Sequence, residues 1–242
     1  MIFLSSCFPN YLQERRAVFF PVSLDESQKN LMSKHLDLVI RENKMTNLTR
    51  IDTRESGELL HIEDSLIGFE EVAFAPRGRY GDLGSGAGFP GIPLAIATGR
   101  ETLLVDARLK KIEALDRMID ELGLSKNVST YFGRIEDLAV EKRASFSVLT
   151  ARALAKLSVL MEFASPLLVS GGRLVCYKAS IEDIEMQHAL KIQKTVGMEL
   201  ISSRSCMLSD GLTFRTIVVF EKKRKPQIKL PRKVGFAQKK PL

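Results

Sequence analysis

The chain has 242 residues, of which 45% are hydrophobic and 27% charged, as expected for one substantial α/β domain with a small appended piece. No stretch approaches the roughly 20 apolar residues of a membrane-spanning helix, which argues against an integral membrane protein. The net charge is +7, but residues 222–242 hold nine basic residues and no acidic one, so the rest of the chain carries −2. Cys7, Cys176 and Cys206 are too few and too scattered for a disulfide framework or a zinc site. We therefore predict a reducing, cytoplasmic setting and no metal.

The first part of the chain reads as an extension followed by helices. Residues 1–22 are expected to form an N-terminal extension. They contain Leu4-Ser-Ser-Cys7, which looks like a lipoprotein cleavage site, but no basic region or apolar run precedes it, so no signal peptide is predicted. Apolar residues recur at helical spacing over 24–43, with Ser23 or Asp25 as the cap, and a second helix is expected over 58–69. We interpret residues 23–75 as a small helical lead-in packed on the catalytic domain.

Residues 76–221 alternate between strand-like and helix-like patterns. Amphipathic helices are clearest over 109–122 and 181–196. Alternation of this kind predicts βαβ units and a central, mostly parallel sheet flanked by helices. The candidate strands are 79–83, 102–106, 128–132, 146–150, 173–177 and 214–220.

A glycine-rich loop, Asp82-Leu-Gly84-Ser-Gly86-Ala-Gly-Phe89-Pro-Gly91, follows the first candidate strand. Glycines allow tight turns and a close approach of the backbone to a ligand, and the helix behind the loop offers free N–H groups. Part of the loop also matches the G-x-G-x-x-G pattern of dinucleotide-binding folds. Two features favour S-adenosylmethionine instead: the acid two residues before the first glycine, which a sulfonium tolerates better than a pyrophosphate does, and two prolines where a dinucleotide fold enters its first helix.

Asp106 ends the second candidate strand, where a carboxylate can bind a ribose diol in either fold. The loop and this strand end together predict a Rossmann-like class I methyltransferase. Its predicted cofactor-binding residues include Asp82, Gly86 and Asp106.

Ordered motifs along the chain then carry a specific resemblance. From about residue 28 to the C-terminus the chain resembles the RsmG (GidB) family, small-subunit ribosomal RNA methyltransferases that modify N7 of a guanine in 16S rRNA. The chain departs from the family pattern at Glu42, where an aromatic residue is usual, and at Ile135, a small-residue position. The matching segments are Asn43-Lys44-x-x-Asn47-Leu48-Thr49, His61-Ile-x-Asp64-Ser65-Leu66, the loop 82–91, Asp106 with Lys110-Lys111, Gly133-Arg-x-Glu136, Ala151-Arg152-Ala153, Tyr177-Lys178, and Leu230-Pro-Arg232-x-x-Gly235 through Pro241-Leu242.

The resemblance implies roles for individual residues. Gly84 and Phe89 would contact the cofactor from the loop, Ile135 and Glu136 would border its adenine, and Arg152 would lie at the cofactor or substrate edge. A surface ion pair is the alternative for Arg152, and core packing for Phe89. His61 and Asp64 are three residues apart and could share a helix face, either toward the RNA or as a capping pair. No residue is assigned a catalytic role.

The chemistry of the remaining motifs agrees with attack by N7. The chain has no Asn/Asp-Pro-Pro-Tyr/Phe motif for exocyclic amines and no Pro-Cys nucleophile, and its fourth strand ends without the Asp of a ribose-methylating tetrad. Guanine N7 has a free lone pair and loses no proton, so in-line methyl transfer needs positioning and electrostatics but no general base. The expected partner is 16S rRNA or the small ribosomal subunit, and the protein is expected to be a monomer.

Three other functions fit parts of the sequence: a small-molecule methyltransferase, a dehydrogenase, and a non-catalytic assembly factor that retains the fold. The basic segment 222–242 favours a polyanionic partner, with a solvated tail as the alternative.

Overall fold

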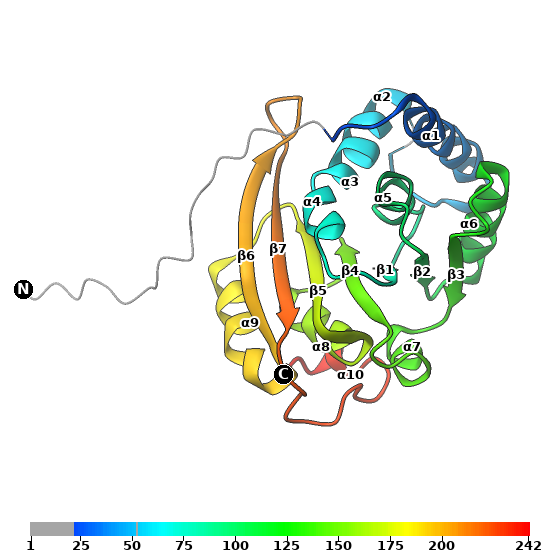
Figure 1. Cartoon of the computed structure of the whole chain (residues 1–242). Coiled ribbons are helices and arrows are strands. Elements are labelled where there is room, and N and C mark those ends of the chain that lie inside the picture. The colour runs from blue at the N-terminus through cyan, green and yellow to red at the C-terminus, as the bar shows by residue number, and fades with distance from the viewer. Residues whose placement is uncertain (1–21, 52) are drawn as a thin grey trace, which may run out of the picture.

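The structure is a computed structural model that describes residues 22–51 and 53–242 (Figure 1). The predicted extension 1–22 lies outside the described residues except for Val22. Within the described chain, a seven-stranded sheet has the order β3-β2-β1-β4-β5-β7-β6. The strands β1 to β5 are parallel, and β7 runs antiparallel to both β5 and β6. The predicted α/β class with a mostly parallel sheet is therefore confirmed. The strands are β1 (Tyr80–Leu83), β2 (Thr102–Asp106), β3 (Val128–Phe132), β4 (Phe146–Arg152), β5 (Leu168–Lys178), β6 (Met198–Met207) and β7 (Phe214–Lys222).

Helices cover both faces of this sheet, because its central strands are apolar on both sides. On one face, α1 (Glu26–Thr46), α5 (Gly91–Thr98) and α6 (Leu109–Leu122) pack around Leu104 of β2. On the other face, α7 (Ile135–Glu141), α8 (Leu157–Leu167) and α9 (Asp183–Val196) pack around Leu103 and Leu149. The remaining helical segments are α2 (Arg54–Gly57), the π-helix η1 (Glu58–Glu63), α3 (Asp64–Leu66), α4 (Phe69–Ala73) and α10 (Phe236–Lys239).

The lead-in is anchored to the body by its first helix. Asp25 is the N-cap of α1 and forms a capping box with Gln28, one of the two caps that the sequence offered. Such a cap is worth about 1 kcal/mol. The unusual Glu42 is 2% exposed and accepts hydrogen bonds from Arg117 of α6, at 2.6 Å, and from Arg41. At this position the chain replaces aromatic packing with a charged clamp between α1 and α6.

Two features differ from the sequence-based expectation. The helix predicted over 58–69 is interrupted: it begins as the π-helix η1 and breaks at Gly68 before α4. The strand β6 was not predicted, because it is an edge strand that pairs only with β7 and alternates little between buried and exposed residues. Such a strand needs no continuous apolar pattern.

The basic segment 222–242 is folded against the body. Leu230 and Ala237 are buried in the core that α7, α8 and α9 share. Arg232 forms a bidentate ion pair with Glu162 of α8, at 2.7 and 2.6 Å. The alternative of a freely solvated tail is therefore wrong, although several of its lysines remain exposed.

Candidate functional site

The strand order places the site. The sequence order of the strands reverses between β1 and β4, so the crevice of this sheet lies at their carboxyl ends. The loop that follows β1 and the end of β2 lie on one side of this reversal, and the ends of β4 and β5 lie on the other. The first side carries the residues predicted to bind the cofactor, and the second has room for a substrate.

The glycine loop has the backbone that its sequence predicts. Gly84 and Gly86 have φ of 75° and 60°, a left-handed conformation that other residues adopt at a cost. A Cβ on Gly84 would lie 2.8 Å from Leu154 of the segment after β4, so the loop and that segment are in contact. A Cβ on Gly86 would meet nothing closer than 3.6 Å, so the loop has open space above it.

Asp106 lies beside this open loop. Its Oδ2 accepts a hydrogen bond from the backbone N–H of Gly86 at 3.1 Å, and its Oδ1 accepts from that of Arg108 at 2.9 Å. A carboxylate at the end of β2 next to an open glycine turn is the donor set that a ribose diol and an adjoining amino acid moiety require. The residues therefore fit S-adenosylmethionine, with Gly84, Gly86 and Asp106 as the groups that would hold it.

Asp82 lies beneath the loop. It is 1% exposed, and its carboxylate accepts hydrogen bonds from the Thr150 hydroxyl at 2.7 Å and the Gly91 backbone N–H at 3.2 Å. Burial raises the pKa of Asp82 to about 6, and the Thr150 hydroxyl opposes that shift. Asp82 thus ties β1 to β4 and to the start of α5, which shapes the loop. Its direct contact with the cofactor remains a prediction.

Phe89 sits in a stack of rings behind the loop. Its ring lies parallel to that of His61 at 4.2 Å between centroids, and the His35 ring packs against it at 4.5 Å. Burial lowers the pKa of His61 to about 3 and that of His35 to about 4, so both imidazoles are neutral at physiological pH. The stack joins α1, η1 and the loop into one unit, which makes Phe89 part of the packing as well as a candidate cofactor contact.

Arg152 leaves the end of β4 and joins the sheet to the lead-in. Its Nη1 donates to Asp64 Oδ2 at 2.8 Å and to the backbone oxygen of Leu60 at 3.2 Å. Arg215 of β7 donates from Nε to the other oxygen, Asp64 Oδ1, at 2.8 Å. Asp64 is only 3% exposed, so two guanidinium groups compensate one buried carboxylate. The ion pair considered for Arg152 exists, and it lies inside the site.

A cavity of about 460 Å³ opens beside this triad. That volume is within the range of small-molecule and nucleotide pockets. Its wall includes Leu60, Asp64, Arg152, Tyr177, Lys178 and Arg215, with Ala153 and Ala155 on either side of the Leu154 that contacts Gly84. The cavity therefore shares the segment after β4 with the cofactor loop.

Ile135 and Glu136 lie at the start of α7, after β3. Ile135 belongs to the core around α7 to α9, and Glu136 accepts a hydrogen bond from the backbone N–H of Gly235 at 2.7 Å. Both side chains are buried. The structure thus connects the predicted adenine border to the C-terminal segment, and contact with adenine itself stays a prediction.

The predicted site residues come together around the carboxyl ends of β1, β2 and β4, but sequence reasoning missed Arg215. This arginine starts β7, and β7 is antiparallel to β5 with Thr216 opposite Lys178. The beginning of an antiparallel strand lies at the carboxyl edge of its parallel neighbours. A basic residue at the head of the apolar run Ile217–Phe220 was the available signal, but it could be used only once the direction of β7 was known.

Comparison with known proteins agrees with this geometry. The family model described as "rRNA small subunit methyltransferase G" (GidB) matches residues 28–211. The protein named Ribosomal RNA small subunit methyltransferase G from Streptococcus pyogenes serotype M12 is 35% identical over 224 residues, covering 91% of this chain and 94% of the relative. The protein of the same name from Streptococcus thermophilus CNRZ 1066 is 34% identical over 223 residues, covering 90% and 93%.

Solved structures show the same fold at low sequence identity. A cofactor-bound structure of Rv0187 from MTB aligns with a TM-score of 0.56 and 15% identity, over 79% of this chain and 90% of the other. Geranyl diphosphate methyltransferase in complex with GPP and sinefungin aligns with a TM-score of 0.55 and 13% identity, over 83% and 100%.

The predicted enzyme class and cofactor are confirmed: the chain is an S-adenosylmethionine-dependent rRNA methyltransferase. The dehydrogenase alternative that the glycine pattern allowed is thereby excluded. On its sequence, its fold and its cofactor loop, the chain belongs to the rRNA small subunit methyltransferase G family.

Proposed function

We propose that the chain methylates N7 of a guanine in 16S rRNA by direct in-line transfer, without a general base. The observation that carries this proposal is the chemistry of the cavity. Among the described residues of its wall, the one carboxylate belongs to Asp64, and both of its oxygens accept hydrogen bonds from arginines. Methylation of an amine or a hydroxyl needs a group that removes a proton, whereas N7 of guanine has none to lose.

His61 is the nearby alternative for a base, and its contacts argue against that role. Its Nε2 lies 3.2 Å from the Thr49 hydroxyl, its Nδ1 faces Arg152 at 3.4 Å, and its ring is stacked on Phe89. Burial and the positive charge of Arg152 lower its pKa to about 3, which makes the imidazole a weak base. Positioning is therefore the work that the described residues are suited to do.

The cofactor, when bound, supplies a methyl group on a positively charged sulfur. The protein's part is to hold that group still and to exclude water. Gly84 and Gly86 let the backbone approach it, Asp106 would fix the ribose, and Leu154 closes the side toward the cavity. Guanine N7 lies in the narrow major groove of A-form RNA, so we expect the target base to be single-stranded or drawn out of its stack.

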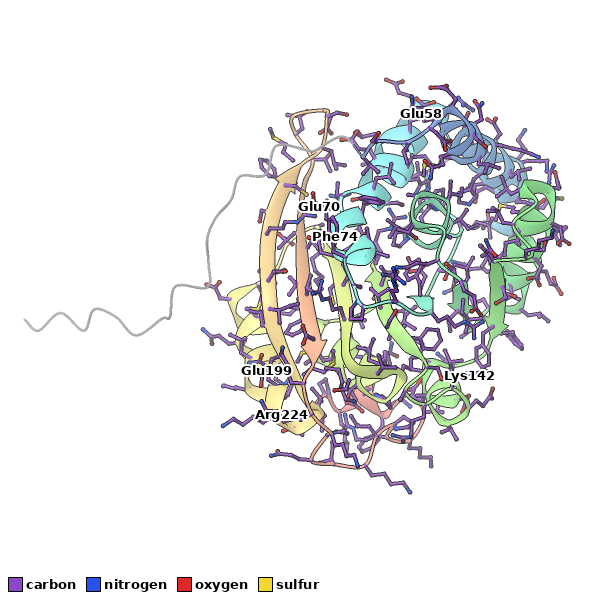
Figure 2. All side chains as sticks on the ribbon, viewed as in Figure 1. Glu58, Glu70, Phe74, Lys142, Glu199 and Arg224 are labelled. Atoms are coloured by element: carbon purple, nitrogen blue, oxygen red, sulfur yellow. The ribbon has the colours of Figure 1, made fainter. Side chains whose placement is uncertain are left out.

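We further propose that the protein acts as a monomer in the cytoplasm on 16S rRNA or the small ribosomal subunit. No helix in the part of the chain that the structure describes is long and apolar enough to cross a membrane. Exposed lysines of the C-terminal segment supply phosphate contacts. They lie far from the cavity: Figure 2 shows Arg224 and Lys142 at the opposite end of the molecule from Glu58, the first residue of η1. The RNA contact would then extend well beyond the target base.

The test is methyl transfer in vitro. The purified chain and labelled S-adenosylmethionine are incubated with 16S rRNA, or with small subunits, from cells that lack the gene. Borohydride and aniline then cleave the RNA at N7-methylguanosine. We expect one cleavage site with the wild-type chain and none with Gly86→Asp, which fills the cofactor loop. Label on the RNA without cleavage would place the methyl group on another atom and refute the N7 assignment.

A further inference from the structure

The Arg152–Asp64–Arg215 triad forms one wall of the cavity, and neither Asp64 nor Arg215 is needed to hold the cofactor. Asp64 is almost fully buried, yet its carboxylate has hydrogen-bonding capacity left: it offers about four lone-pair sites, and the two arginines use one on each oxygen. We propose that this cavity holds the target guanine and that Asp64 reads its Watson–Crick edge, an inference that rests on the proposed function.

The chemistry of the wall selects guanine among the bases. The Watson–Crick edge of guanine presents two donors, N1–H and the N2 amino group, beside the acceptor O6. A carboxylate can accept from both donors, while a neighbouring guanidinium of Arg152 or Arg215 donates to O6. Adenine would instead turn the lone pair of its N1 toward Asp64. A free phosphate is a poorer occupant, because the carboxylate repels it.

The rest of the wall suits a flat base. Leu60 and Tyr177 contribute apolar and aromatic surface, and RNA-binding proteins hold extruded bases between such side chains. Lys178 is engaged by Glu185 of α9 at 2.7 Å, so among the described cations of the wall the two arginines of the triad are the ones directed at Asp64. The polar groups are thus gathered at one edge of an otherwise apolar cavity.

This arrangement also points N7 in the required direction. N7 lies on the imidazole side of guanine, away from the Watson–Crick edge. Asp64 belongs to the lead-in and Arg215 to β7, whereas the segment with Leu154 that contacts Gly84 borders the cofactor loop. A guanine whose Watson–Crick edge faces Asp64 therefore turns its imidazole side toward the loop.

The π-helix η1 explains how the lead-in reaches this position. Its wider turns precede α3 directly, and they bring the Leu60 carbonyl and the Asp64 carboxylate onto the same guanidinium nitrogen of Arg152. Short π-helical turns are frequent at functional sites, where they redirect side chains.

The first test replaces the target guanosine of an rRNA fragment by inosine, which lacks only the N2 amino group. If Asp64 accepts from that group, wild-type kcat/KM falls by about 10- to 100-fold on the inosine RNA, the range for a hydrogen bond to a charged group. Asp64→Asn should methylate guanosine RNA more slowly but should no longer distinguish the two RNAs. Equal wild-type rates on both RNAs, or undiminished discrimination by Asp64→Asn, would overturn the proposal.

A matched pair of arginine variants separates base reading from structural support. Arg215 and Arg204 both pair with an acid of the lead-in, Arg215 with Asp64 and Arg204 with Glu71 at 2.6 Å, but Arg204 does not line the cavity. We expect Arg215→Met to lower kcat/KM at least 10-fold with little change in S-adenosylmethionine affinity. Arg204→Met should keep kcat/KM and lose only thermal stability. Equal losses of kcat/KM would assign the triad a structural role and refute base reading.

The two proposals fail in different ways. Transfer to N7 without discrimination against inosine would remove the role of Asp64 and leave the proposed function standing. Transfer to an atom other than N7 in the guanosine RNA would refute both.

Discussion

Asp82 gives the sharpest test of how the loop is built, through the pH dependence of stability. Its carboxyl group is buried, and burial raises its pKa from 3.8 to about 6. In the unfolded chain Asp82 loses its proton near pH 4, whereas in the folded chain it keeps the proton up to about pH 6. The folded state thus binds more protons in this window, and the free energy of unfolding falls as the pH rises through it.

The size of the effect follows from the shift. One pKa unit corresponds to about 1.4 kcal/mol, so Asp82 removes about 3 kcal/mol of stability between pH 4 and pH 7. Asp82→Asn cannot titrate. Because one of the two bonds to Thr150 and Gly91 is absent in this variant, we expect a constant cost of about 1–3 kcal/mol at every pH. The difference between variant and wild type should therefore change by about 3 kcal/mol in favour of Asn as the pH rises.

The assay is urea unfolding of both chains at intervals from pH 4 to pH 8. Thr150→Val is the companion variant, since the Thr150 hydroxyl stabilises the ionised carboxylate. Without it the pKa of Asp82 should rise further, and the sloping window should extend to higher pH. A difference between Asp82→Asn and wild type that is independent of pH would contradict the burial of an ionisable group beneath the loop.

Three further perturbations address the clamp, the loop and the tail. Arg117→Met leaves Glu42 buried with only Arg41, so thermal unfolding should show a loss of about 1–3 kcal/mol; an unchanged melting temperature would mean that the clamp contributes nothing. Gly86→Asp puts a side chain at φ 60° beside Asp106, and calorimetry should find no S-adenosylmethionine binding by a chain that is still folded. Neutralising three exposed lysines of the tail should flatten the salt dependence of RNA binding by about 0.7 for each RNA phosphate that a lysine no longer neutralises, and an unaltered slope would exclude the tail from the RNA interface; the lysines are Lys229, Lys233 and Lys239.

The parts of the fold that follow from local pattern were predictable from the sequence. The buried parallel strands have continuous apolar runs, and the loop glycines at 84 and 86 adopt the left-handed backbone that their sequence suggests. The edge strand β6 was missed because edge strands need no such run. The tail looked solvated because its charges dominate its composition, yet Leu230 and Ala237 anchor it in the core.

The candidate site was harder to predict where it depends on contacts between distant segments. The loop, Asp106 and Arg152 each follow a predicted strand, so their meeting at one sheet edge could be inferred. The second partner of Asp64 could not, because Arg215 is 151 residues away and reaches it only through the antiparallel turn of β7. The burial of Asp82 beneath the loop likewise depends on its register with Thr150, which no local pattern records.

The proposed reaction is tested most directly by the nucleosides of 16S rRNA from cells with and without this gene. Small-subunit RNA from both strains is digested, and N7-methylguanosine is quantified by mass spectrometry and mapped to its position. We predict that one N7-methylguanosine disappears without the gene and returns when the wild-type gene is restored, but not when Gly86→Asp is supplied. An unchanged content of N7-methylguanosine in the strain without the gene would contradict the proposed reaction.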